Sequence, residues 1–144
     1  MTPVDLTTPP APRTGGSVAP SLPVVVTDER PWGRFDLLTL NQRSTVKVLT
    51  VDPGCRLSLQ RHTSRDEWWT ALDPGLEVEV GGRTSLLTVG ERVWIPRGTT
   101  HRVRCTGSAP ARFLEVAFGD FDECDIERLE DDYARLQPDA TAQR

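Results

Sequence analysis

The chain is poor in the residues on which many kinds of binding site depend. Only two histidines, His62 and His101, occur among its 144 residues. The three cysteines, Cys55, Cys105 and Cys124, are odd in number and form no C-x-x-C pair. The sequence therefore predicts neither a disulfide framework nor a thiolate zinc site, and this cysteine usage fits a reducing, cytoplasmic environment.

Long apolar runs and an excess of positive charge are also missing. No stretch approaches the ~20 consecutive apolar residues of a membrane-spanning helix, and no signal-peptide pattern is present. The 17 basic and 21 acidic side chains give a net charge of −4, so no basic field would recruit nucleic acid or anionic lipid. We expect no nucleic-acid or membrane partner, and a locally basic pocket for any small anionic substrate.

Composition divides the chain into a tail and one domain. Residues 1–27 are rich in Pro, Thr, Ala, Gly and Ser, and such a segment cannot bury enough surface to offset its backbone entropy. We predict a disordered tail over 1–27, in which Val24-Val25-Val26 is a candidate edge strand. Residues 28–138 are predicted to fold around a single core.

From Pro31 onward, short β-type runs alternate with turn signals such as Asp52-Pro-Gly54 and Asp73-Pro-Gly75. Proline fixes φ in these turns, and glycine accepts a positive φ. Many short strands at even spacing predict an all-β sandwich or barrel. The expected strands cover residues 34–40, 45–51, 56–60, 66–72, 76–80, 84–89, 92–95, 101–105 and 112–118.

The pattern changes near the end of the chain. Ile126, Leu129, Tyr133 and Leu136 would form one apolar stripe of a helix, and Asp122 is a suitable N-cap. The sequence therefore predicts a C-terminal α-helix on the outside of the barrel.

Side chains suited to metal binding occur in two segments. The first contains Gln60 and His62 and is followed by Glu67, and the second ends at His101. Two imidazoles, a carboxylate and a carboxamide suit Zn, Mn, Fe, Co or Ni better than a thiolate-seeking ion. The competing interpretation is that both histidines are ordinary hydrogen-bonded residues.

Strand parity favours the metal site. Ser58, Gln60 and His62 are spaced by two, so a strand reaching His62 would point all three to one face. Inward polar groups are costly unless something binds them.

These segments resemble the paired motifs of cupins. Gln60-x-His62 stands where His-x-His is usual, and it is followed by Glu67 and by Pro96-x-Gly98-x-x-His101. More specifically, residues 28–135 resemble the cupin domain of type II mannose-6-phosphate isomerases, the C-terminal part of bifunctional enzymes that also carry mannose-1-phosphate guanylyltransferase. The matching strings are Arg30-Pro-Trp-Gly33, Arg56-Leu-Ser-Leu-Gln60, Trp69 after Glu67, Ile95-Pro-Arg-Gly-Thr-Thr-His101-Arg102 and Ile126-Glu-Arg-Leu-Glu-Asp-Asp-Tyr-Ala-Arg135.

The resemblance implies a cupin-type β-barrel, also called a double-stranded β-helix or jelly-roll. It implies interconversion of mannose 6-phosphate and fructose 6-phosphate in carbohydrate metabolism, with a sugar phosphate as the small-molecule partner. The cofactor would be a divalent metal, with Zn favoured and Mn, Co, Ni, Fe or Mg as alternatives. Its implied ligands are Gln60, His62, Glu67 and His101.

Three residues are candidates for catalysis. Lys47 and Arg102 match basic residues of the family strings, so either would bind phosphate or support the enediolate. The base would be Glu67, Lys47 or a metal-bound water. Solvent-exposed strand cations are the expectation for Arg56, Arg61 and Arg65.

The chain also departs from the family. The family usually has histidine at three positions that are Thr63, Ser64 and Trp68 in this chain. Residues 62 and 64 therefore cannot form a pair of histidine ligands. The guanylyltransferase domain is absent, and that activity is not carried over. Two other functions stay open: a non-catalytic cupin that binds a sugar phosphate or nucleotide sugar, and a cupin that uses its metal for oxygen chemistry. Homodimerisation is also left open.

Removing the residues before Thr27 should leave folding intact, because a Pro-rich segment contributes little to a core. Thermal unfolding of the truncated and full-length chains checks this, and the midpoints should agree. A large drop in the midpoint would show that the valine cluster is a structural strand.

Overall fold

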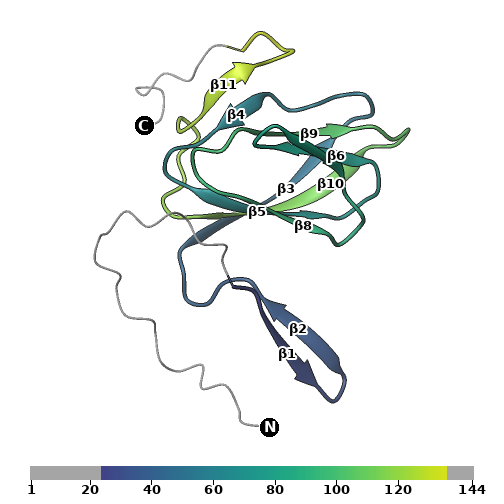
Figure 1. The fold of residues 1–144 in the computed structure, drawn as a ribbon, viewed down its shortest axis with the longest axis vertical. Coiled ribbons are helices and arrows are strands. Elements are labelled where there is room, and N and C mark those ends of the chain that lie inside the picture. The colour runs from purple at the N-terminus through teal and green to yellow at the C-terminus, as the bar shows by residue number, and fades with distance from the viewer. Residues whose placement is uncertain (1–23, 136–144) are drawn as a thin grey trace. The chain divides into compact units, whose positions relative to one another are not determined.

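The computed structural model describes residues 24–135, which form antiparallel sheets (Figure 1). The strands are β1 (Val26–Arg30), β2 (Gly33–Leu37), β3 (Ser44–Val51), β4 (Leu59–Arg61), β5 (Asp66–Ala71), β6 (Leu76–Val80), β7 (Arg83–Leu86), β8 (Arg92–Ile95), β9 (His101–Cys105), β10 (Ala111–Phe118) and β11 (Glu127–Glu130). The predicted all-β fold class is confirmed. The described residues contain no helix long and apolar enough to cross a membrane.

The chain divides into two units, one up to Gln42 and one from Arg43. In the first unit β1 and β2 form a hairpin whose register runs from Val26 opposite Leu37 to Arg30 opposite Gly33. β1 thus contains the last valine of the predicted edge strand. Residues 1–23 lie outside the described residues, so the disordered tail stays a prediction.

The second unit is built from two facing sheets (Figure 1). One has the strand order β3-β10-β5-β8 and the other β11-β4-β9-β6-β7. Alternate side chains of each strand point between the sheets, where they form the apolar core. This core contains Val51, Trp69, Ala71, Leu76, Val78, Leu87, Ile95, Val103, Cys105, Ala111 and Phe113.

The predicted C-terminal helix is wrong within the described residues. Glu127–Glu130 is strand β11, which pairs with β4 and places Glu127 opposite Arg61. An apolar spacing of three to four residues is weak evidence over so short a segment. Here the segment completes the edge of a sheet, and Leu136 of the predicted stripe lies outside the described residues.

A glycine fixes the turn at the end of β10. Gly119 has φ of +104°, and a Cβ at this position would lie 3.0 Å from the backbone oxygen of Ser64. Any residue other than glycine would therefore be strained at this position, both by the positive φ and by the close backbone oxygen of Ser64. The turn leads into residues 120–126, which contact the functional site.

Gly119→Ala should destabilise the protein by about 1–3 kcal/mol more than Gly54→Ala, because only the first change adds a steric clash. Gly54 has φ of +76° and open space around its Cβ position, so it isolates the cost of the positive φ. Urea unfolding of both variants provides the measurement. Equal losses would contradict the close approach to Ser64.

Candidate metal centre

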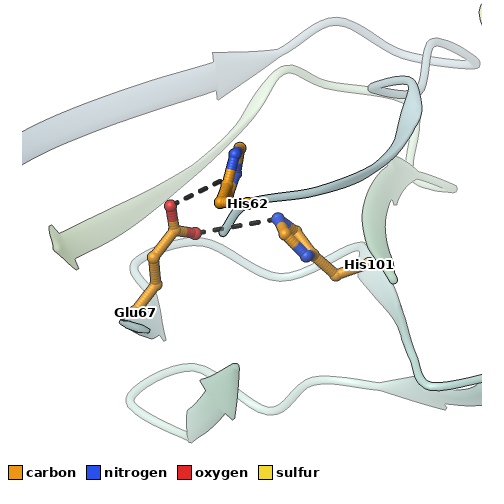
Figure 2. A group of neighbouring side chains, drawn as sticks. All are labelled: His62, Glu67 and His101. Atoms are coloured by element: carbon orange, nitrogen blue, oxygen red, sulfur yellow. Dashed lines mark ion pairs between the residues drawn. The ribbon is translucent and has the colours of Figure 1, made fainter. Parts of the chain in front are cut away.

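Three side chains that lie far apart in the sequence meet inside the barrel (Figure 2). His62 directly follows β4, Glu67 lies on β5, and His101 begins β9. All three are at most 2% exposed. Two of them come from the five-stranded side and one from the four-stranded side, so the fold is required to assemble them.

The carboxylate of Glu67 faces both imidazoles, with one oxygen directed at each (Figure 2). Its Oε1 is 3.4 Å from His62 Nε2, and its Oε2 is 3.8 Å from His101 Nε2. One ligand atom from each residue falls within 4.8 Å of the others. This is the arrangement of a three-residue cation site.

Backbone carbonyls set the tautomer of both histidines. His62 Nδ1 lies 2.6 Å from the carbonyl oxygen of Asp125, and His101 Nδ1 lies 2.9 Å from that of Thr99. A carbonyl only accepts hydrogen bonds, so each Nδ1 donates its proton and each Nε2 carries a lone pair on the side of Glu67. Such second contacts are typical of metal-ligating histidines.

The donor set fits a divalent cation. Lone pairs of His101 Nε2 and the Glu67 carboxylate face each other, and His101 Nε2 is buried without a hydrogen-bond partner. An unpaired buried acceptor is costly, and a cation between these atoms would satisfy it.

Burial keeps both imidazoles neutral at physiological pH. It lowers the pKa of His101 to about 4, against the opposing effect of the Glu67 charge. The pKa of His62 is also lowered, again chiefly by burial. Neutral imidazole is the form that binds metal.

Arg65 is also part of this site, and its participation was not predicted from the sequence. We expected an exposed strand cation, but Arg65 is 6% exposed. Its Nε donates to Glu67 Oε1 at 2.8 Å, and its Nη2 lies 3.2 Å from His62 Nε2. On the other side of the carboxylate, Trp69 Nε1 donates to Glu67 Oε2 at 3.0 Å.

Gln60 shares the inner face with these residues. It lies directly opposite His101 in the β4–β9 pairing, so both side chains are on one face. The Ser58 hydroxyl donates to Gln60 Oε1 at 2.7 Å. Gln60 is therefore next to the three-residue group, and its role as a fourth ligand stays a prediction.

The two predicted catalytic cations lie in different places. Lys47 is opposite the buried Glu115 in the β3–β10 pairing, pairs with Glu123 and lies 4.1 Å from the centre of the Phe121 ring. It faces the barrel interior.

Arg102 is not brought to the three-residue group. It follows the inward His101 on β9 and lies on the outer face, where its Nη1 donates to Glu130 Oε2 at 3.0 Å. It lines a surface pocket of about 230 Å³ with Arg56, Glu77, Glu79, Thr84 and Arg104. The structure does not bring Arg102 to the candidate metal centre, and its predicted catalytic role stays a prediction.

Glu115 is a second buried acid that the sequence analysis missed. It is 7% exposed, and burial, followed by the charge of Glu67, raises its pKa to about 7. The positive charges of Arg65 and Lys47 act in the opposite direction. Alternation along β10, where Phe113 and Ala117 point inward, was the signal that could have identified it.

An antiparallel double-stranded β-helix with an inward His/Glu/His group defines the cupin class. A solved structure from Klebsiella pneumoniae subsp. pneumoniae MGH 78578, described as an uncharacterized conserved protein with a double-stranded beta-helix domain, matches this fold with a TM-score of 0.54. It is 23% identical, and the match covers 79% of this chain and 91% of that one.

The family model "Mannose-6-phosphate isomerase C-terminal" matches residues 23–131, and the chain belongs to this family. The chain is 43% identical over 107 residues to the xanthan biosynthesis protein XanB of Xanthomonas campestris pv. campestris (strain B100). It is 38% identical over 108 residues to the mannose-1-phosphate guanylyltransferase ManC of Salmonella typhimurium (strain LT2). These matches cover 74% of this chain but only 23% and 22% of the two relatives.

The stability of Glu115→Gln relative to the parent should rise with pH in metal-free protein. Because the folded pKa of Glu115 is raised to about 7, the parent loses stability as pH rises from the unfolded value of about 4.5 through 7, whereas glutamine does not titrate. Thermal midpoints at pH 5, 6, 7 and 8 with a chelator present measure the difference. A difference independent of pH would contradict the perturbed Glu115.

Proposed function

We propose that this chain is a metal-dependent sugar-phosphate isomerase that interconverts mannose 6-phosphate and fructose 6-phosphate. One observation carries the proposal: in a member of this family, His62, Glu67 and His101 converge in the barrel, with both Nε2 atoms within 3.8 Å of one carboxylate. The family relationship supports the reaction class.

In the proposed enzyme His62, Glu67 and His101 hold the cation, with Gln60 beside them. A bound divalent cation stabilises the negative charge that develops on the sugar oxygens during enolisation. The residues keep the site dry, since the three side chains are at most 2% exposed. A dry site strengthens each charge interaction inside it.

Isomerisation also requires a proton to move between C1 and C2. Glu67 serves the cation, which leaves Glu115 and Lys47 as interior groups for proton transfer. A carboxyl group with a pKa of about 7 is well matched to neutral conditions. We therefore assign proton transfer to Glu115, with Lys47 next to it on β3.

The alternative is a non-catalytic cupin that binds a sugar phosphate or nucleotide sugar. Thr63, Ser64 and Trp68 favour it, because they replace the histidines that the family usually has around the site. Both functions require a bound metal, but only the isomerase would convert mannose 6-phosphate to product.

Purified protein should contain about one divalent metal per chain, and His62→Ala or His101→Ala should remove most of it. Elemental analysis gives the metal content. Arg61→Ala is the matched control, because Arg61 pairs with Glu127 and lies next to His62 without entering the site. Undiminished metal in either histidine variant would exclude that residue as a ligand.

A coupled assay with mannose 6-phosphate and added Zn, Mn, Co, Ni, Fe or Mg tests the reaction. Turnover by the parent, lost in both histidine variants and kept in Arg61→Ala, is the expected result. Metal binding without turnover, together with calorimetric binding of mannose 6-phosphate, would establish the binding function instead.

A further inference from the structure

Arg65 occupies the position in which a cation would contact His62 and Glu67. Since His62 Nδ1 donates to the Asp125 carbonyl, the lone pair on Nε2 is its remaining site of interaction. Arg65 Nη2, which can only donate, lies 3.2 Å from that nitrogen. The lone pair that would bind a metal is therefore engaged by an arginine.

The same guanidinium also engages the carboxylate. Arg65 Nε donates to Glu67 Oε1 at 2.8 Å, so one planar fork bridges two of the three ligand residues. His101 Nε2 lies outside its reach and has no partner. Arg65 thus supplies positive charge and hydrogen bonds to Glu67 and His62, but it leaves His101 Nε2 without the partner that a divalent cation would provide.

A metal and Arg65 in this position exclude each other. A metal bound to His62 requires the lone pair that Arg65 uses, and two positive charges would lie only a few ångströms apart in a buried site. Metal binding must therefore displace the guanidinium from His62 and Oε1 of Glu67.

Two further contacts hold the Arg65 guanidinium in this same position. Its guanidinium carbon is 4.3 Å from the centre of the Phe121 ring, and its Nη1 donates to the Asp122 carbonyl at 2.9 Å. Both contacts belong to residues 120–126 and neither involves a metal ligand. A guanidinium that leaves His62 and Glu67 but keeps one of these two contacts would stay beside the site, with its Nε and Nη2 free to donate.

We propose that Arg65 is a built-in counter-cation that a divalent metal displaces, and that the displaced guanidinium then binds the phosphate of the substrate. Only the identity of this anion rests on the proposed function. A phosphate monoester carries about two negative charges and suits the arginine fork. Lys47, which faces the same interior, is already paired with Glu123, and Arg102 lies on the outer face.

Metal titration without sugar tests the first half of the proposal. Arg65→Gln should bind Zn about 10- to 100-fold more tightly than the parent in calorimetry, because no charge-assisted hydrogen bonds to His62 and Glu67 must be broken. Arg61→Gln, which removes a neighbouring arginine paired with Glu127 on the other face, should bind Zn like the parent. Equal or weaker Zn binding by Arg65→Gln would overturn the proposal and make Arg65 a support for the carboxylate.

A measurement on the parent guards against a variant that does not fold. In the ¹H–¹⁵N spectrum the Arg65 Nε–H signal, assigned by its absence in Arg65→Lys, should shift when Zn is added, because its bond to Glu67 is lost. A signal that Zn binding leaves unchanged would overturn the displacement.

Inorganic phosphate tests the second half. Zn should tighten phosphate binding by the parent at least about fivefold, and by linkage phosphate should tighten Zn binding equally. Arg65→Gln should lose this coupling, whereas Arg61→Gln should keep it. Coupling that persists in Arg65→Gln would assign the phosphate to another group. None of these measurements depends on turnover, so a failed isomerase assay leaves their result intact.

Discussion

The interior of this protein is organised around one buried negative charge, the carboxylate of Glu67. A buried carboxylate is costly unless it is paired and hydrogen-bonded, and Glu67 meets this condition through Arg65 on one oxygen and Trp69 on the other. The two histidines complete its surroundings. Glu67 lies opposite Ile95 in the β5–β8 pairing, so the backbone of the four-stranded sheet fixes the position of this charge.

The same strands supply both stability and chemistry, but at different levels of the barrel. Along β9 the inward residues are His101, Val103 and Cys105, and along β5 they are Glu67, Trp69 and Ala71. The polar members lie at the beginning of each strand and the apolar ones follow. The apolar level anchors the strands, and the polar level is held rigidly because its residues continue the same strands.

Strand alternation made much of this structure predictable from sequence. It placed Gln60 and His62 on one inner face, while the turn signals identified most of the strands and the paired motifs added Glu67 and His101 as candidates for the same site. Applied to β9, alternation also requires Arg102 to face away from His101, which the match to the family string does not indicate. Arg65 could not be predicted in this way, because it precedes β5 and its position depends on residues 121–122.

The mistaken helix prediction concerns a segment on which the site depends. A helix starting at Asp122 would direct the carbonyls of Asp122 and Asp125 along its axis, toward amides four residues later. In the folded protein these two carbonyls instead accept from Arg65 and His62. The Asp125 carboxylate also accepts from the amides of Thr63 and Ser64. The non-helical path of this segment thus fixes the tautomer of one candidate ligand and the position of the arginine that occupies its lone pair, so the segment's hydrogen bonds are decided by the site and not by local helix propensity.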